Sequence, residues 1–319
     1  MQATDPASPA VSVLIISFNT REMTLACLRS LFAETQQPFE TIVVDNASQD
    51  GSAAAIAAEF PQVRLLAETE NHGFARANNL AAPLARGEYL LLLNPDTLVL
   101  EAAVDHLLGF ARARPEARIW GGRALFGDGR LNPGSCWRRM TFWGLFCQAS
   151  GLRSLLRRSA LFNPESYGGW DRRTERAVDI VSGCFFLISK ADWQVLNGFH
   201  PDFFMYGEEA DLCLRAQRSL GARPRITPTA TIVHYAGASE TVRADKMVRL
   251  LRAKRALIRR HFPAWQQPLA LALFAAWPLS RWRATALLAR LTGRSGWRER
   301  ARVWGEIWTR RREWRVELG

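Results

Sequence analysis

The sequence predicts an α/β protein: a mostly parallel central sheet with helices on both faces, followed by a C-terminal helical extension. Two observations predict this fold class. Apolar runs alternate with helix-like segments in the first third of the chain, and those runs are continuous, as in strands buried on both faces. The 319 residues suffice for about two domains, and a content of 48% hydrophobic and 23% charged residues disfavours extensive disorder.

The expected elements alternate between strand and helix. The first apolar run ends in a polar residue, and apolar residues recur at helical spacing in the segment after it. Ser52 is the candidate cap of the next, alanine-rich helix. The expected strands are residues 11–17, 40–45, 63–67 and 88–93, and the expected helices are residues 21–33, 52–60, 74–84 and 101–114.

The second half of the chain has a less regular pattern. Residues 127–177 are rich in Gly, Arg, Trp and Pro, and we interpret them as a variable insertion or an acceptor-side segment. An apolar strand is expected at residues 178–189 and a short helix at 192–196. A helix whose acidic first turn suits the positive end of its dipole is expected at 208–220, and a last strand at 230–235.

The net charge of +12 comes from one end of the chain. Residues 1–100 contain 5 Arg against 11 Asp and Glu, whereas residues 243–319 contain 19 Lys and Arg against 5 acidic residues. We therefore predict a flexible N-terminus at residues 1–10, an α/β domain at 11–240 and a basic, Trp-rich helical extension at 241–319.

Two apolar runs, residues 11–18 and 269–277, are too short to span a bilayer, which takes about 20 residues. No basic residue precedes Arg21, so we expect no secretory signal.

The five cysteines are odd in number and form no CxxC pair. That pattern disfavours a disulfide scaffold or a zinc ribbon and indicates a reducing, cytoplasmic compartment.

Polar or acidic residues follow each of the four strands expected in the first hundred residues. The ligand crevice of such a sheet lies beyond the carboxyl ends of its strands, so we expect the site there. No GxGxxG or GxxxxGK loop follows the first strand. A hard cation held by carboxylates is then the natural way to neutralise a nucleotide's phosphates. The residues at these strand ends are Ser17, Asn19, Asp45, Asn46, Glu70, Asn71, Asn94 and Asp96.

Four motifs stand in order along the chain, at residues 43–52, 71–79, 92–96 and 203–213; they read VVDNASQDGS, NHGFARANN, LLNPD and FFMYGEEADLC. Together they resemble the family 2 glycosyltransferases, which have the GT-A fold. The chain is most similar to the bacterial rhamnosyltransferase and galactofuranosyltransferase-like branch. The resemblance extends over roughly residues 10–240.

The resemblance implies a role for each matching residue. Asp45 corresponds to the acid that contacts the base or ribose of the nucleotide sugar. Asp96 corresponds to the metal ligand of the DxD motif, and Glu209 to the general base, where Asp is more usual. His234 is similar to a histidine that joins the metal in some members. We further expect donor contacts from Ser17, Asn19, Asn71, Gly73, Asn78 and Asn94 (Asn94 replaces the usual first Asp of DxD), and an acceptor side formed by Glu208 and Asp211.

The implied reaction is an inverting, metal-dependent transfer of rhamnose or another hexose. The donor would be a dTDP-, UDP- or GDP-sugar, and the acceptor a hydroxyl of a glycan or of a lipid-linked sugar in cell-surface polysaccharide biosynthesis. Mg²⁺ or Mn²⁺ would stabilise the departing diphosphate, and a carboxylate would remove the acceptor's proton.

The extension has two interpretations. Its tryptophans could pack on the domain beneath a solvated basic face. Alternatively, it could anchor the protein peripherally to the anionic inner face of the cell membrane, where each cation contributes on the order of 1 kcal/mol. We favour the anchor, because residues 265–319 hold seven of the twelve tryptophans, and Trp297, Trp304 and Trp308 are spaced to share a helix face. The acidic first domain argues against nucleic acid as the partner.

Other interpretations of the candidate residues stay open. Asp45 could be a turn residue, Asp96 a helix cap, and Glu208 or Asp211 a partner of Arg215. Two other classes of protein also remain. One is a sugar nucleotidyltransferase with similar acidic strand ends, and the other is a non-catalytic membrane- or glycan-binding module.

Overall fold

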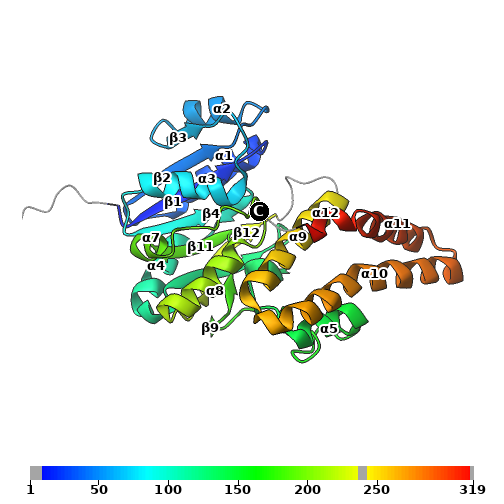
Figure 1. Ribbon diagram of the computed structural model, residues 1–319. Coiled ribbons are helices and arrows are strands. Elements are labelled where there is room, and N and C mark those ends of the chain that lie inside the picture. The colour runs from blue at the N-terminus through cyan, green and yellow to red at the C-terminus, as the bar shows by residue number, and fades with distance from the viewer. Residues whose placement is uncertain (1–8, 236–242, 317–319) are drawn as a thin grey trace, which may run out of the picture. The chain divides into compact units, whose positions relative to one another are not determined.

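The computed structural model describes residues 9–235 and 243–316 (Figure 1). The chain forms two compact units. The sheet unit comprises residues 1–137, 171–204 and 208–239, and the helical unit comprises residues 138–170, 205–207 and 240–319. The helical unit is therefore larger than the extension expected at 241–319. Of the N-terminus expected to be flexible, residues 1–8 lie outside the described residues.

A ten-stranded mixed sheet forms the centre of the sheet unit within the described residues, in the order β3-β2-β1-β4-β11-β6-β12-β5, with β7 beside β6 and β9 beside β12. The first four strands of that order are parallel. β11 is antiparallel to both β4 and β6, β12 is parallel to β6, and β5 is antiparallel to β12. The ten strands are β1 Val11–Ser17, β2 Phe39–Asp45, β3 Arg64–Ala67, β4 Tyr89–Leu93, β5 Thr97–Val99, β6 Ile119–Leu125, β7 Leu131–Asn132, β9 Arg176–Ala177, β11 Phe185–Ser189 and β12 Arg225–His234. A separate two-stranded sheet pairs β8 Cys136–Trp137 with β10 Ile180–Val181.

Helices cover both faces of this sheet, as the continuous apolar strands predict. Val13 and Ile15 of β1 belong to the core cluster that includes Leu28 and Ile56 from the helices α1 and α2. The helix α3 contacts β1 and β2 but contributes none of its buried residues to that cluster, so it covers the opposite face. The helices of this unit are α1 Arg21–Glu34, α2 Ser52–Glu59, α3 Gly73–Ala81, α4 Ala103–Ala113, α7 Lys190–Val195 and α8 Glu208–Leu220, with single turns at Ala82–Leu84, Pro115–Ala117 and Pro133–Ser135.

Several local expectations are corrected by the structure. Ser52 does not cap its helix; Gly51 is the N-cap, and the Ser52 hydroxyl donates to Asp50 instead. The strand expected at 178–189 is divided into β10 and β11, because the backbone turns where Phe185 N–H donates to the Ser182 carbonyl. Asp96 precedes the strand β5 rather than a helix, so it is not a helix cap.

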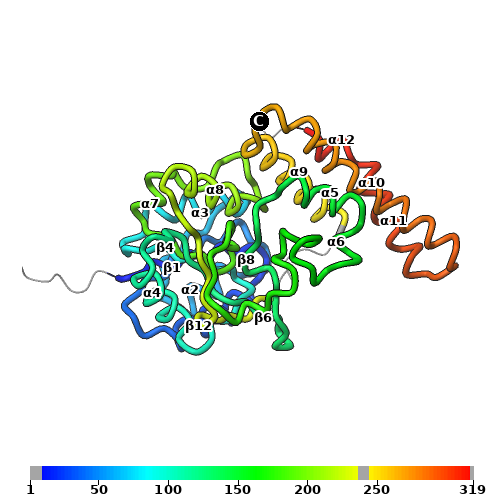
Figure 2. The backbone as a smooth tube through the Cα atoms, turned by 90° about the horizontal axis from the view of Figure 1, so that it is seen from below, coloured from blue at the N-terminus to red at the C-terminus, as the bar shows by residue number. Residues whose placement is uncertain are grey.

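The helical unit combines residues 138–170 with the C-terminal helices. The helix α5 Phe142–Ser150 lies beside the helix α10 Gln267–Thr292 (Figures 1 and 2). The hydroxyl of Ser280 donates to the carbonyl of Ala149 between them. Lys254 pairs with Glu165 and so joins the two segments. The other helices of this unit are α6 Leu152–Leu155, α9 Arg243–His261, α11 Ser295–Thr309 and α12 Arg311–Arg315, with a single turn at Ala264–Gln266.

Several tryptophans of the extension pack inside the helical unit. α10 and α11 form a hairpin that turns at Gly293 (φ +64°). Trp277 contacts Trp304 across it at 5.8 Å between ring centroids, and Trp314 lies buried against Phe274 at 6.2 Å. Within residues 9–235 and 243–316, no helix is both long and apolar enough to cross a membrane.

Candidate active site

The parallel register brings the candidate residues of the first motifs to one edge of the sheet. Ser17 pairs with Asp45 at the ends of β1 and β2. Leu14 pairs with Leu92, so the residues after β4 run beside the last residues of β1. Parallel strands end at a common edge, and ligands of such sheets bind there.

Asp45 is a buried carboxylate with an unused oxygen. It is 3% exposed, and one oxygen accepts a hydrogen bond from Ser48 N–H at 3.2 Å. The other oxygen, Oδ1, has no hydrogen-bond partner among the described residues. A buried polar atom without a partner costs stability, so this position suits a donor group supplied by a ligand.

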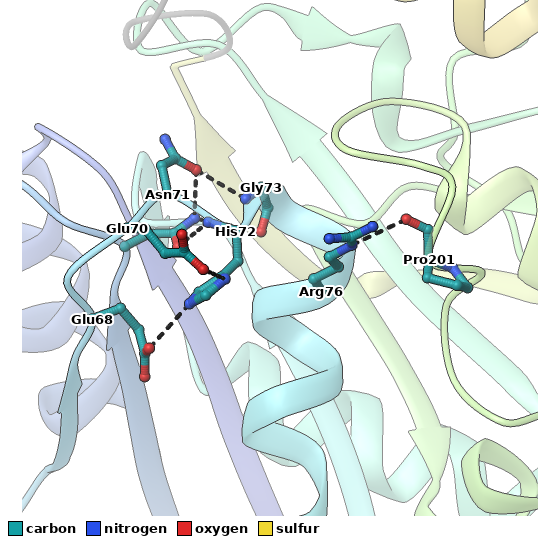
Figure 3. Close-up of polar contacts among 8 residues, drawn as sticks. Glu68, Glu70, Asn71, His72, Gly73, Arg76 and Pro201 are labelled. Atoms are coloured by element: carbon teal, nitrogen blue, oxygen red, sulfur yellow. Dashed lines mark hydrogen bonds and ion pairs between the residues drawn. The ribbon is translucent and has the colours of Figure 1, made fainter. Parts of the chain in front are cut away.

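Asn46 links the second strand end to the first turn of α3. Its amide donates to Asn71 Oδ1 at 2.9 Å, and its oxygen accepts from His72 N–H at 2.9 Å. Asn71 Oδ1 also accepts from Gly73 N–H at 2.9 Å (Figure 3). We did not assign Asn46 a role from the sequence. The signal for one was its place directly after Asp45 at a strand end.

The second and fourth motifs meet at the start of α3. Gly73 has a φ of +74°, and a Cβ there would lie 2.3 Å from the Phe204 carbonyl oxygen. That carbonyl accepts from Phe74 N–H at 2.7 Å. Arg76 donates to the carbonyl of Pro201 at 3.3 Å, one turn further along the helix (Figure 3). Close backbone contact therefore explains why the motif has glycine at position 73.

His72, in the same motif, points away from this contact toward two carboxylates. Its Nε2 lies 3.0 Å from Glu68 and its Nδ1 lies 3.5 Å from Glu70 (Figure 3).

Asn78 is fully buried; its amide donates to the Phe74 carbonyl at 2.9 Å, and its Oδ1 has no partner among the described residues. Its role as a donor contact stays a prediction.

Asp96 and His234 form a pair at the junction of β5 and β12. His234 pairs with Thr97 in the strand register, and Tyr235 N–H donates to the Asp96 carbonyl at 3.0 Å. The side chains meet with 3.3 Å between His234 Nε2 and Asp96 Oδ1. Burial opposes the charged imidazole, but interactions with Cys184 and with the Asp96 carboxylate outweigh it and raise the pKa of His234 to about 10.

This pair fits a cation site completed by a substrate. Within residues 9–235 and 243–316, no group of three or more His, Cys, Asp or Glu side chains could hold a metal ion by itself. Mg²⁺ and similar ions commonly use one or two carboxylates plus substrate phosphates and water. Asp96 with the His234 imidazole supplies that kind of partial ligand set, and the ion would displace the histidine's proton.

The turn at residues 182–184 connects the remaining candidates. The Cys184 carbonyl accepts from Asn94 N–H at 3.1 Å, and the Cys184 side chain interacts with His234. At Gly183, an added Cβ would lie 3.9 Å from the Cβ of Glu209. The candidate base and the candidate metal pair therefore border the same short turn. A Cys at this turn was not among the residues that we selected from the sequence.

The acids of α8 differ in their surroundings. Asp211 is fully buried and accepts from Arg215 Nε at 2.7 Å, and the Arg215 guanidinium also donates to the carbonyls of Leu196 and Gly198. The structure therefore shows the pairing with Arg215 for Asp211. Its place on the acceptor side, like that of the 4% exposed Glu208, stays a prediction.

Ser17 and Asn19 hold the loops at the strand ends. The buried Ser17 hydroxyl lies 2.9 Å from the Thr24 hydroxyl. Asn19 (φ +52°) donates its N–H to Ser48 and accepts from Gln49 N–H at 2.8 Å. Contacts of these residues with a donor stay predictions.

The fold is therefore an α/β sheet covered by helices, and the candidate ligand site lies at the carboxyl ends of its strands, where Asp45 and Asp96 supply carboxylates. Residues 12–196 match the family model described as glycosyl transferase family 2. The chain belongs to that family and is a glycosyltransferase.

Curated relatives lie in the rhamnosyltransferase-like branch. The chain is 28% identical over 248 residues to the O-antigen biosynthesis protein RfbC of Myxococcus xanthus; the match covers 75% of this chain and 18% of that protein. It is 27% identical over 222 residues to the N-acetylglucosaminyl-diphospho-decaprenol L-rhamnosyltransferase of Mycobacterium tuberculosis; that match covers 65% of this chain and 70% of the relative.

Solved structures confirm the expected GT-A fold. A mannosyltransferase from Pyrobaculum calidifontis, solved with GDP-Man and Mn²⁺, has a TM-score of 0.57 at 20% identity; the match covers 95% of this chain and 86% of that one. GalNAc-T7, solved with UDP, GalNAc and Mn²⁺, has a TM-score of 0.55 at 15% identity, with 84% of this chain and 52% of that one covered.

Proposed function

We propose that this protein is an inverting, metal-dependent glycosyltransferase. It transfers rhamnose or another hexose from a dTDP-, UDP- or GDP-sugar to a hydroxyl of a glycan or a lipid-linked acceptor. The observation that carries the proposal is the turn at residues 182–184, to which Glu209, Asn94 and the Asp96–His234 pair all lie close.

The nucleotide of the donor binds at the ends of β1 and β2. The unpartnered Oδ1 of Asp45 accepts a hydrogen bond from the base or ribose there. The bonds from Asn46 to Asn71 and His72 hold this edge in one arrangement before the donor arrives. Binding then requires little reordering of the loops, which favours affinity.

Asp96 and His234 hold a divalent cation, Mg²⁺ or Mn²⁺, against the donor's diphosphate. When bound, the ion supplies positive charge that stabilises the leaving nucleoside diphosphate. Two GT-A neighbours were solved with Mn²⁺, which supports this choice of ion.

Glu209 removes the proton from the attacking acceptor hydroxyl. It is 9% exposed and lies in the first turn of α8, where the helix dipole favours the ionised carboxylate. An ionised carboxylate in hydrogen-bond reach of a hydroxyl can act as its base during attack. One base and one displacement invert the anomeric centre.

Of the two acceptor classes, we favour the lipid-linked one, presented at the inner face of the cell membrane. The name of the Mycobacterium tuberculosis relative, which specifies a decaprenol diphosphate, supports a lipid-linked acceptor. The excess of cations at residues 243–319 supports an anionic membrane surface.

The experiment that tests the reaction combines donor screening with product analysis. Nucleotide sugars are first screened by thermal shift with and without Mn²⁺, because a ligand that binds only the native state raises the melting temperature. The selected donor is then incubated with the enzyme and a lipid-linked acceptor. We expect a nucleoside diphosphate and a glycosylated acceptor. Release of pyrophosphate would instead indicate a nucleotidyltransferase, and no turnover above background would indicate a binding module.

A further inference from the structure

The helical unit exposes large apolar side chains within residues 138–170, part of the segment that the sequence predicts to be a variable insertion or an acceptor-side segment. We call these side chains the α5–α6 patch. Leu155 is 81% exposed and Leu161 is 60% exposed, and the others are more than 40% exposed. Single exposed apolar residues are common on proteins, whereas contiguous exposed apolar patches mark interaction sites. The patch consists of Trp143, Phe146, Leu155, Leu156 and Leu161.

Part of the patch is held in place by contacts of its own. Trp143 and Phe146 are three residues apart on α5, so they share a face, and their rings stack with centroids 5.5 Å apart. Leu145 is buried in the core of the helical unit, so it faces the other way. Trp143 Nε1 donates to the Leu161 carbonyl at 2.6 Å, which fixes the following loop beside α5. The ring stack and the hydrogen bond therefore hold the aromatic side chains of the patch in a fixed arrangement.

Arginines without carboxylate partners accompany the patch. Arg281 of α10 donates to the hydroxyl of Ser154 at 2.7 Å, directly beside Leu155 in the chain. Burial, together with the nearby charges of Arg153 and Arg157, lowers the pKa of Arg281. Arg153 is neutralised by Glu165, whereas no carboxylate of the described residues lies within the 4.0 Å ion-pair distance of Arg157 or Arg281. Positive charge next to exposed apolar groups is thus left uncompensated.

We propose that the α5–α6 patch is the surface by which this protein binds an anionic lipid bilayer. Trp143, Leu155 and Leu161 enter the interface, and Arg157 and Arg281 contact lipid phosphates. Apolar side chains flanked by arginines have the composition of interfacial membrane-binding segments.

The inference places the membrane contact apart from Trp304 and Trp314. Trp304 packs on Trp277, and Trp314 is 1% exposed, so these rings stabilise the helical unit. The inference rests on the proposed lipid-linked acceptor for its biological sense, but its test requires no transfer activity.

The test is cosedimentation of the full chain with vesicles. One set of vesicles contains phosphatidylcholine alone, and the other also contains phosphatidylglycerol. We expect binding to the anionic vesicles that weakens with salt. The double variant Leu155→Gln/Leu161→Gln should bind roughly tenfold more weakly or worse, since both apolar side chains leave the interface. Val195→Gln is the matched control, because Val195 is 64% exposed on α7 of the sheet unit; it should bind like the unmodified protein.

A second measurement locates the contact without depending on affinity. Brominated lipids quench tryptophan fluorescence at the interface, and we expect Trp143→Phe to remove more of that quenching than Trp265→Phe, although Trp265 is 80% exposed. Equal binding by the double variant and the Val195→Gln control would overturn the inference. So would a patch that proves to join two copies, seen as a dimer in light scattering that the double variant dissociates. If the protein transfers sugar to a soluble acceptor but does not bind vesicles, the membrane inference is wrong and the proposed reaction stands. If it binds vesicles but transfers no sugar, the proposed reaction is wrong and the membrane inference stands.

Discussion

One carboxylate of the sheet unit, Asp45, and one guanidinium of the helical unit, Arg281, differ in charge but share a feature: neither forms an ion pair with another described residue. In the sheet unit, the 3% exposed Asp45 keeps one oxygen that has no hydrogen-bond partner among the described residues. In the helical unit, the buried carboxylate of Glu165 has two cationic partners, Lys254 and Arg153, while Arg281 has a hydroxyl instead of a carboxylate. A buried charged or polar group without a partner in the protein costs stability, so such groups are the best candidates for contacts with a ligand. By this criterion we expect a cationic or hydrogen-bond-donating ligand group at Asp45 and an anionic ligand group at Arg281.

The same contrast exists within one helix. Asp211 and Glu209 are two residues apart on α8, yet Asp211 is bonded to Arg215 and Glu209 borders the turn at residues 182–184. An acid that carries chemistry and an acid that stabilises the fold should respond differently to loss of charge. The following variants test that distinction, from the largest expected effect to the smallest.

Asp96→Ala should abolish transfer, with a loss of about 1,000-fold or more, since a metal's stabilisation of the leaving diphosphate is worth several kcal/mol. The fold should survive, because Asp96 lies at a strand junction that backbone hydrogen bonds already hold. The measurement is the transfer rate with Mn²⁺ present, together with a thermal melt. Asp128→Ala, at an exposed pair with Arg130, is the control and should keep full activity. Wild-type turnover in Asp96→Ala would refute the metal assignment.

Glu209→Gln should lower kcat by about 100- to 10,000-fold, the range of general acid–base contributions, and should leave donor affinity unchanged. Asp211→Asn should do the reverse: it should lower the melting temperature through loss of the buried pair with Arg215, with a smaller effect on kcat. Kinetics and donor titration by calorimetry measure both variants. Loss of donor binding in Glu209→Gln would assign Glu209 to the donor side.

Glu165→Gln should destabilise the helical unit by about 3 kcal/mol, because it leaves the cations Lys254 and Arg153 facing a neutral group. Burial raises the pKa of Glu165, but the two cations outweigh it and hold that pKa below its usual value. A lowered pKa in the folded state gives stability that is present above the unfolded-state pKa and is lost as the pH falls through the folded-state value. The gap in melting temperature between wild type and variant should therefore close in acid. A gap that persists below the folded-state pKa would show that the charge is not the cause.

Gly73→Ala should destabilise the sheet unit by about 2 kcal/mol, combining a left-handed backbone with a clash against the Phe204 carbonyl. Gly129→Ala is the matched control, since Gly129 also has a positive φ (+79°) but, within the part of the chain that the structure describes, no atom within 4 Å of the point that a Cβ would occupy. Gly129→Ala should lower the free energy of unfolding by about 1 kcal/mol, which is the cost of the left-handed backbone without a steric clash. Equal melting temperatures for the two variants would show that the contact with Phe204 is not tight.

The strands and helices of the first hundred residues were predictable because their signal is local. Continuous apolar runs indicate buried strands, and β1 begins and ends at the expected residues 11 and 17. The helix at Glu208–Leu220 was also predicted at both ends, with an acidic first turn that suits the positive end of its dipole. Ser52 failed as a cap because the side chain of Asp50 competes for its hydroxyl, an interaction that periodicity does not report.

By itself, the sequence determined the α/β class, the alternation of the first strands and helices, and the residue types that could carry the chemistry. Only the tertiary structure decided that the sheet is mixed, that residues 138–170 join the C-terminal helices, and that Asp96 meets His234. The physical reason is the range of the forces involved. Hydrophobic periodicity and backbone preference act over a few residues. Which distant strands pair depends on the burial and hydrogen bonding of the whole chain, and loop closure costs little more for a long connection than for a short one.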